Sequence, residues 1–170
     1  MKDRYRFEWE VNVLRDPQIN AFCLPSGKIA VFTGLFRVAV NADSLATVLS
    51  HEISHALAHH ASERMARAHY ESSGGEILSY FINKQHDRAQ EAEADKIGVF
   101  LMTFAGYDPT AAVEFWQRMM ELAHGRSHPP EIFSTHPSDA RRLEQLRQWV
   151  PYARAAKKAY DEGRIARPPR

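Results

Sequence analysis

The feature that most constrains this chain is the run His51-Glu52-Ile53-Ser54-His55, an HExxH motif. It lies in a segment whose apolar residues recur every three to four positions, and Asp43 or Ser44 can cap its start. Side chains four residues apart project from the same face of a helix, so both imidazoles can hold one ion. The segment is therefore predicted to be a largely buried helix that carries a metal site.

Glu52 adjoins both histidines and can reach a water molecule on the ion without replacing an imidazole. Zinc lowers the pKa of such a water, and a neighbouring carboxylate can take its proton as the water attacks a carbonyl. A chance HExxH in a chain of this composition has a probability of roughly 3 per cent. We therefore interpret His51 and His55 as ligands of one zinc ion per chain and Glu52 as the general base.

A catalytic zinc ion normally takes three protein ligands. The spacing HExxHxxGxxH is excluded, because Ala58 and Ala61 occupy the glycine and third histidine positions. His59 and His60 follow the motif by one turn, and we interpret them as supporting or surface residues. A glutamate from a second helix is the alternative, and Glu91 supplies one.

The segment around Glu91 carries a second acidic residue at helical spacing. Glu91, Asp95 and Gly98 fall along one face of a helix, whereas Glu93 points nearly the opposite way and is expected at the surface. Asp95 can accept a hydrogen bond from a histidine ligand. The small residues Ala94 and Gly98 allow this helix to approach the HExxH helix closely. The sequence therefore predicts Glu91 as the third ligand and Asp95 as the support of a histidine ligand.

The rest of the chain predicts an α+β fold that is mainly α. Residues 7–13 alternate apolar and polar side chains, as in a half-buried strand, and residues 21–24 and 29–33 form a predicted hairpin. Helices are expected from residue 43 onward, and one of them is expected to end at Val150. One hairpin strand is expected to be an exposed edge that binds an extended peptide; the chosen strand contains Ala30, Val31 and Phe32, with residues 21–24 as the alternative.

Composition limits the kind of protein this chain can be. With 170 residues, 44% of them hydrophobic and 25% charged, we expect a single domain spanning residues 1–170. Its core is placed at about residues 7–150, followed by a C-terminal helix and tail over 151–170. A net charge of +1 gives no reason to expect a nucleic acid partner. A single cysteine excludes an intramolecular disulfide, and no apolar run is long enough for a membrane span.

Four motifs in order resemble the peptidase family that includes CAAX prenyl proteases and HtpX-type heat-shock proteases. They are HExxH with E-x-x-x-D, the segment Asn20–Lys28, the segment Val31–Leu35, and Ser134-Thr135-His136-Pro137-Ser138 with Arg142. The match covers about residues 7–150 and is nearest to soluble bacterial envelope members and the mitochondrial Oma-type protease. The membrane-spanning helices and the helical repeat domain of other members are not found in this sequence.

The resemblance implies a gluzincin fold, with zinc on His51, His55 and Glu91. It also places His136 near the zinc, either polarising the substrate carbonyl or occupying the open position as a fourth ligand that keeps the enzyme latent. Arg142 is expected to orient a nearby carboxylate or to form a surface ion pair.

Two functions follow from these expectations. The first is a zinc metalloendopeptidase that cleaves unfolded or misassembled proteins in protein quality control. The second is a latent, metal-bound chaperone-like or binding module in which His136 blocks the zinc. The N-terminus lacks the apolar core of a signal peptide. The chain is therefore expected either in the bacterial envelope or periplasm, without its targeting segment, or in the cytoplasm.

Overall fold

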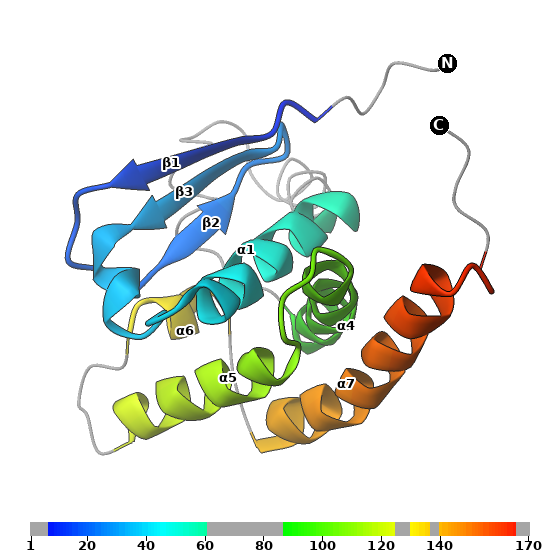
Figure 1. Cartoon of the computed structure of the whole chain (residues 1–170). Helices are drawn as coiled ribbons and strands as arrows, with labels where there is room; N and C mark the ends of the chain where they lie inside the picture. The colour runs from blue at the N-terminus through cyan, green and yellow to red at the C-terminus, as the bar shows by residue number, and fades with distance from the viewer. Residues whose placement is uncertain (1–6, 61–86, 125–129, 137–139, 166–170) are drawn as a thin grey trace.

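The computed structural model describes residues 7–60, 87–124, 130–136 and 140–165. Helices make up most of this part, together with one small sheet, so the predicted mainly helical α+β fold is confirmed (Figure 1). The elements in chain order are β1 (Glu10–Leu14), β2 (Ala21–Cys23), β3 (Lys28–Phe32), the 3-10 helix η1 (Thr33–Arg37), α1 (Ala42–Leu57), α4 (Arg88–Phe104), α5 (Thr110–Ala123), α6 (Ile132–Thr135) and α7 (Ala140–Asp161).

The described sheet has the strand order β1-β3-β2. β2 and β3 pair antiparallel, with Ala21 opposite Val31, so the predicted hairpin is confirmed. β1 pairs parallel to the other side of β3, with Glu10 opposite Lys28. Because β3 is hydrogen-bonded on both sides, the predicted edge strand through Ala30, Val31 and Phe32 is wrong. Among the described strands the edges are β1 and β2.

The first strand is also more exposed than its alternating pattern indicates. Every residue of β1 is exposed, including Val11 at 54% and Val13 at 58%. The strand begins at Glu10, and the preceding Phe7 and Trp9 stack on each other with ring centroids 4.7 Å apart. The alternation correctly indicates extended backbone. The prediction that this strand is half-buried was wrong, because α1 packs against β2, at the opposite edge of the sheet.

Helix α1 is the centre of the fold and lies between the sheet and the other long helices (Figure 1). Asn41 caps it, because its side-chain oxygen accepts a hydrogen bond from the backbone N–H of Ser44 at 2.8 Å. The predicted cap at Asp43 or Ser44 therefore lies two or three residues too late. The buried face of α1 includes His51, Glu52 and His55, so the motif is enclosed by the sheet on one side and helices on the other.

Two glycines let backbones meet closely around this helix. A Cβ atom at Gly98 of α4 would lie 3.2 Å from the backbone nitrogen of His51, which confirms the predicted close approach of the two helices. A Cβ atom at Gly34 of η1 would overlap the carbonyl oxygens of Pro17 and Gln18. At Gly34 a side chain would require the backbone at Pro17 and Gln18 to move, whereas at Gly98 it would require the two helices to separate by a few tenths of an ångström.

Helix α7 runs past the predicted end at Val150 and continues to Asp161, with Pro151 inside it. A proline removes one backbone N–H donor, and the packing of this helix outweighs that loss. Ala153 is fully buried, and the ring of Tyr160 contacts that of Phe104 in α4, with centroids 5.3 Å apart.

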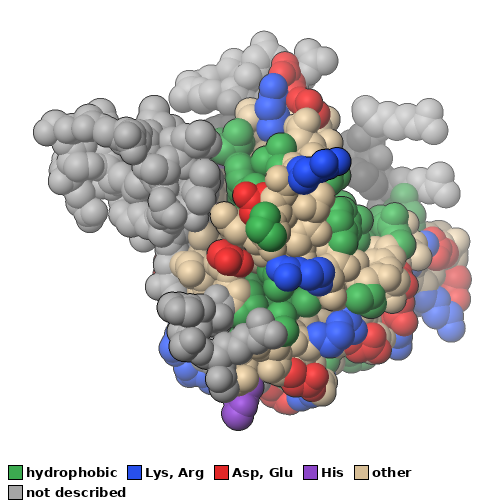
Figure 2. Space-filling view, turned by 90° about the vertical axis from the view of Figure 1, so that its left-hand side faces the viewer, with side chains coloured by type: hydrophobic (Ala, Val, Ile, Leu, Met, Phe, Trp, Pro, Cys, Tyr) green, Lys and Arg blue, Asp and Glu red, His purple; other side chains and the backbone are tan. Residues whose placement is uncertain are grey.

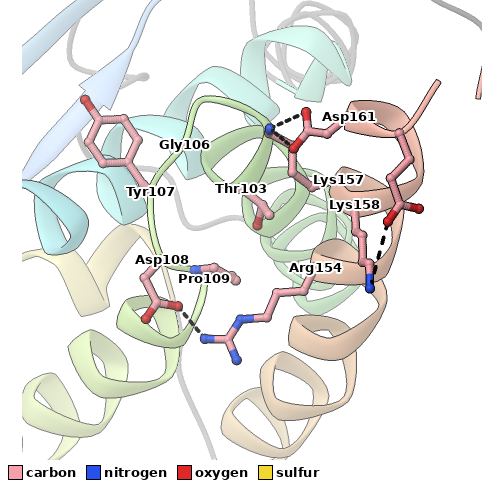
Figure 3. A pocket seen from close by; sticks show the side chains of 10 residues that line it. Thr103, Gly106, Tyr107, Asp108, Pro109, Arg154, Lys157, Lys158 and Asp161 are labelled. Atoms are coloured by element: carbon pink, nitrogen blue, oxygen red, sulfur yellow. Dashed lines mark hydrogen bonds and ion pairs between the residues drawn. The ribbon is translucent and has the colours of Figure 1, made fainter.

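An ion pair between Arg154 and Asp108 joins α7 to the turn between α4 and α5. Figure 3 shows Arg154 pointing across a surface cleft of about 610 Å³ toward Asp108, which accepts its hydrogen bond at 2.6 Å. Lys157 pairs with Asp161 along the same helix. The cleft is lined by charges of both signs that pair with one another, and none of its lining residues belongs to the HExxH motif. It is linked to α1 through the backbone N–H of Asp108, which donates to Asp43 at the start of that helix at 3.0 Å. The pair between Arg154 and Asp108 attaches α7 to the turn before α5.

The described surface agrees with the nearly neutral composition. On the face shown in Figure 2, basic and acidic side chains are mixed with apolar ones. Within the described residues, no helix is both long enough and apolar enough to cross a membrane.

Candidate metal centre

Four side chains from three separate segments meet beside α1. His51 and His55 come from α1, Glu91 from the first turn of α4, and His136 from the residue after α6. Each offers one ligand atom, and these atoms all lie within 4.8 Å of one another. All four side chains are buried. This is a set of donors that can hold one metal ion.

The predicted ligands face one another directly. Nε2 of His55 lies 3.0 Å from Nε2 of His51 and 3.2 Å from Oε1 of Glu91, and Nε2 of His51 lies 3.4 Å from Oε2 of Glu91. Asp87 caps α4 by accepting a hydrogen bond from the backbone N–H of Gln90, which fixes the start of the helix one turn before Glu91. The spacing between Glu91 and Asp95 then turns both carboxylates toward α1.

His136 lies within the same cluster. Its Nδ1 is 2.9 Å from Oε1 of Glu91 and 3.2 Å from Nε2 of His51, and its Nε2 is 3.2 Å from Oε1 of Glu52. The structure therefore brings together the proposed general base, the proposed third ligand and this downstream histidine, as the sequence predicts.

Arg142 at the start of α7 connects the two acidic residues of α4. Its Nη1 lies 2.9 Å from Oε2 of Glu91, while Nε and Nη2 donate to the two oxygens of Asp95 at 2.6 and 2.7 Å. Asp95 in turn lies 2.9 Å from Nδ1 of His51. Of the two predicted roles of Arg142, the one that orients carboxylates matches this geometry, because the side chain is buried rather than at the surface.

Charges inside the cluster compensate for the cost of burying it. Burial alone would raise the pKa of Glu91, but the charges of His136 and Arg142 hold that pKa well below its ordinary value. Burial would lower the pKa of His136, but the carboxylates of Glu91 and Glu52 outweigh this and raise it to about 10. The pKa of His55 is lowered to about 3, chiefly by burial.

The protonation states of the cluster without a metal ion are mixed. Glu91 stays ionised and the pKa of His55 is lowered, as metal ligands require, whereas Glu91 and Asp95 raise the pKa of His51, so a bound cation would displace a proton there. Oε2 of Glu91 and Oε1 of Glu52 are fully buried, and the cationic groups that face them are Arg142 for Glu91 and His136 for Glu52. His136, whose pKa is raised, supplies positive charge between these carboxylates, and it must release a proton before it can act as a metal ligand. Two imidazoles and one carboxylate form a donor set that suits zinc, with a fourth position left for water or His136.

Two residues near the cluster make contacts that the sequence did not indicate. Trp116 of α5 was expected only to fill the apolar core, yet Arg142 lies over its ring. Glu93 was expected at the surface, and its side chain is 59% exposed, but its carboxylate reaches the buried His60 at 3.1 Å. Helical periodicity separates buried from exposed faces but does not indicate which side chain a neighbouring segment will bring into contact.

Comparison with known proteins agrees with this site. A model of peptidase family M48 matches residues 2–80 and 74–150 of the chain. The mitochondrial metalloendopeptidase OMA1 of Schizosaccharomyces pombe is 36% identical over 170 residues, which cover 91% of this chain and 50% of that protein. This chain belongs to peptidase family M48.

Two further relatives show the breadth of the similarity. The metalloendopeptidase OMA1 of Homo sapiens is 34% identical and is matched over 87% of this chain and 33% of its own length. The β-barrel assembly-enhancing protease of Escherichia coli is 30% identical, over 79% of this chain and 33% of that protein. The chain spans about half or less of the length of these relatives.

Proposed function

We propose that this chain is the catalytic core of a zinc-dependent metalloendopeptidase that hydrolyses peptide bonds in protein substrates. The observation that carries the proposal is the convergence of His51, His55 and Glu91 on one point, with the carboxylate of Glu52 facing the same cluster. The family membership and the names of the relatives support it.

The roles of the chain's residues follow from the geometry. A zinc ion, when bound to the two histidines and Glu91, would polarise a carbonyl and lower the pKa of a water. Glu52 accepts the proton of the attacking water and passes it to the leaving amine. Asp95 holds His51 with Nδ1 protonated, which leaves Nε2 free as a ligand.

Zinc content and peptide cleavage test this proposal together. The purified protein should contain one zinc per chain and should cleave casein or a fluorogenic peptide. Glu52→Gln should keep the zinc and lose at least about 100-fold in kcat, whereas Glu91→Ala should lose the zinc. Glu114→Gln, an exposed carboxylate on α5, is the matched control. Undiminished cleavage by Glu52→Gln would overturn the assignment of the general base.

A second candidate function, a latent binding or chaperone-like module, has one specific observation in its favour. His136 lies within reach of Glu91, His51 and Glu52, where it can fill the fourth ligand position. Its other predicted role is to polarise the substrate carbonyl. Cleavage rates of His136→Ala separate the two: a rise supports a latency role, and a fall supports a direct role in catalysis.

The substrate is proposed to bind in extended form along β2. This strand is an edge of the described sheet and packs against α1, so it runs beside the metal cluster. Backbone pairing gives affinity with little demand on sequence, which suits unfolded or misassembled proteins. Peptides whose backbone amides are N-methylated should then show a higher KM than unmodified peptides, with kcat less affected.

The finer assignment within the family and the location also remain proposals. We place the chain nearest the Oma-type and soluble envelope branch, because its relatives include the mitochondrial OMA1 proteins and the β-barrel assembly-enhancing protease. The same names support an envelope location rather than the cytoplasm. The resemblance to HtpX-type and CAAX prenyl proteases stays a prediction from the motifs.

A further inference from the structure

The ligand His55 has a supporting contact of its own, separate from the one that serves His51. Nε2 of His55 faces His51 and Glu91 and is therefore the nitrogen available to a metal ion. Its other nitrogen, Nδ1, lies 2.9 Å from Nδ1 of His60. Nε2 of His60 lies 3.1 Å from Oε2 of Glu93 on α4.

The backbone after α1 makes this contact possible. The helix ends at Leu57, and His59 has a φ of 57°, a conformation that non-glycine residues rarely adopt. This turn folds the chain back, so that His60 is only 2% exposed and its ring meets that of His55 edge-on, with centroids 5.0 Å apart. Aspartate, asparagine and histidine enter this region more readily than other residues.

The order of donors and acceptors follows from Glu93. An ionised carboxylate only accepts hydrogen bonds, so Nε2 of His60 carries a proton. With a neutral imidazole, Nδ1 of His60 is then an acceptor. It takes the hydrogen bond from Nδ1–H of His55, and this tautomer leaves the lone pair of His55 Nε2 for the metal.

We propose that Glu93 and His60 form a positioning pair that fixes the tautomer and ring orientation of His55. Ligating histidines generally donate their second N–H to a fixed acceptor. His51 has Asp95 for this purpose, and His55 has His60 backed by Glu93. Both residues act through His55 rather than on substrate. The inference rests on the proposed zinc site.

Zinc affinity is the direct measurement, obtained by competition of the purified protein with a chromophoric chelator at pH 7.5. His60→Leu should bind zinc about 10 to 100-fold more weakly, as for other residues that support metal ligands. His60→Gln should recover much of that loss, because its side-chain oxygen can still accept from His55. Glu93→Gln should weaken binding by roughly threefold to tenfold, less than the roughly 10 to 100-fold expected for His60→Leu, because Glu93 acts one step further from the metal.

A double-variant cycle separates positioning from general stability. If Glu93 acts through His60, Glu93→Gln should cause no further loss of affinity in the His60→Leu background. Glu114→Gln is the matched control, because its side chain is 61% exposed, against 59% for Glu93. If His60→Leu binds zinc with wild-type affinity, the proposed pair is wrong. The proposal is also wrong if Glu93→Gln lowers the zinc affinity by the same factor in the His60→Leu background as in the wild type.

Two results distinguish this inference from the proposed function. A wild-type protein that binds no zinc overturns both. A wild-type protein that binds zinc, with His60→Leu binding it equally well, overturns the positioning pair alone. Where His60→Leu does not fold, Glu93→Gln decides, because its largely exposed carboxylate can be replaced without disturbing the core. An affinity equal to that of Glu114→Gln then counts against the proposal.

Discussion

Arg142 lies over the indole ring of Trp116, with its Cζ atom 3.5 Å from the ring centroid. The ring packs against the guanidinium, whose nitrogens meet Glu91 and Asp95. A flat cation on an aromatic face is attracted to it, by about 2 kcal/mol when desolvated. Trp116 thus holds the side chain that joins the two acidic residues of α4.

Arg142→Met should destabilise the metal-free protein by about 3–5 kcal/mol, because it leaves buried carboxylates without their partner. Arg142→Lys should recover part of this loss, since it restores the charge but neither the two-pronged hydrogen bonding nor the stacking. Urea denaturation in the presence of a chelator measures both. Arg154→Met, which breaks the exposed pair of Figure 3, is the control and should cost less than about 1 kcal/mol. Equal losses for Arg142→Met and Arg154→Met would contradict this role.

Gly98→Ala should reduce the free energy of zinc binding more than it reduces the free energy of unfolding. The new Cβ atom would stand 3.2 Å from the nitrogen and 3.3 Å from the Cα of His51, and backbone cannot swing aside. Helix α4 must therefore shift and carry Glu91 away from the histidines. Alanine favours a helix over glycine by about 1 kcal/mol, which offsets part of the packing cost. A more stable variant with unchanged zinc affinity would show that the close approach is not required.

Gly34→Ala should reduce the free energy of unfolding by about 2–3 kcal/mol or more, as severe overpacking does. The added carbon overlaps the carbonyl oxygens of Pro17 and Gln18, and the N–H of Gly34 is bound to Asp16 at 2.8 Å. Gly163→Ala is a useful comparison, because its φ of 71° strains alanine while nothing lies within 4 Å. That strain costs of order 1 kcal/mol. Equal losses in the two variants would mean that the segment at Pro17 moves aside freely.

Cys23 should resist alkylation in the folded protein. Burial, and then the charge of Glu52, raise the pKa of its thiol to about 12. The thiol therefore stays protonated from pH 7 to 9, while the unfolded chain begins to form the reactive thiolate as the pH approaches 9. Iodoacetamide at pH 8.5, followed by mass spectrometry, should label the denatured chain far faster than the native one. Comparable rates in the two states would show that β2 opens readily.

The sequence was most informative where chemistry depends on local spacing. HExxH places His51 and His55 on one face of one helix, and the four-residue step from Glu91 to Asp95 does the same on α4. Those positions could be predicted because each depends on a single helix period. The meeting of the two helices was indicated by Gly98, since a missing side chain at that face allows close contact.

Relationships that depend on partners elsewhere in the chain were harder to predict. A two-residue alternation identifies extended backbone, yet the choice between β2 and β3 as the edge depends on where β1 docks. The end of α7 was misplaced because a proline costs one hydrogen bond, and packing at Ala153 outweighs it. The support of His55 by His60 depends on an unusual backbone angle at His59, which no pattern of apolar residues indicates.

The three predicted ligands come from helices far apart in the sequence, and this has a thermodynamic consequence. His55 and Glu91 are separated by 36 positions, and the sequence contains a single cysteine, so no disulfide within the chain can link the two helices. An ion bound to both residues would be a cross-link between the halves of the fold. In the chain-entropy model, a cross-link that closes a loop of that length lowers the conformational entropy of the unfolded chain by the equivalent of about 4 kcal/mol. The ion that takes part in hydrolysis would then also stabilise the folded state.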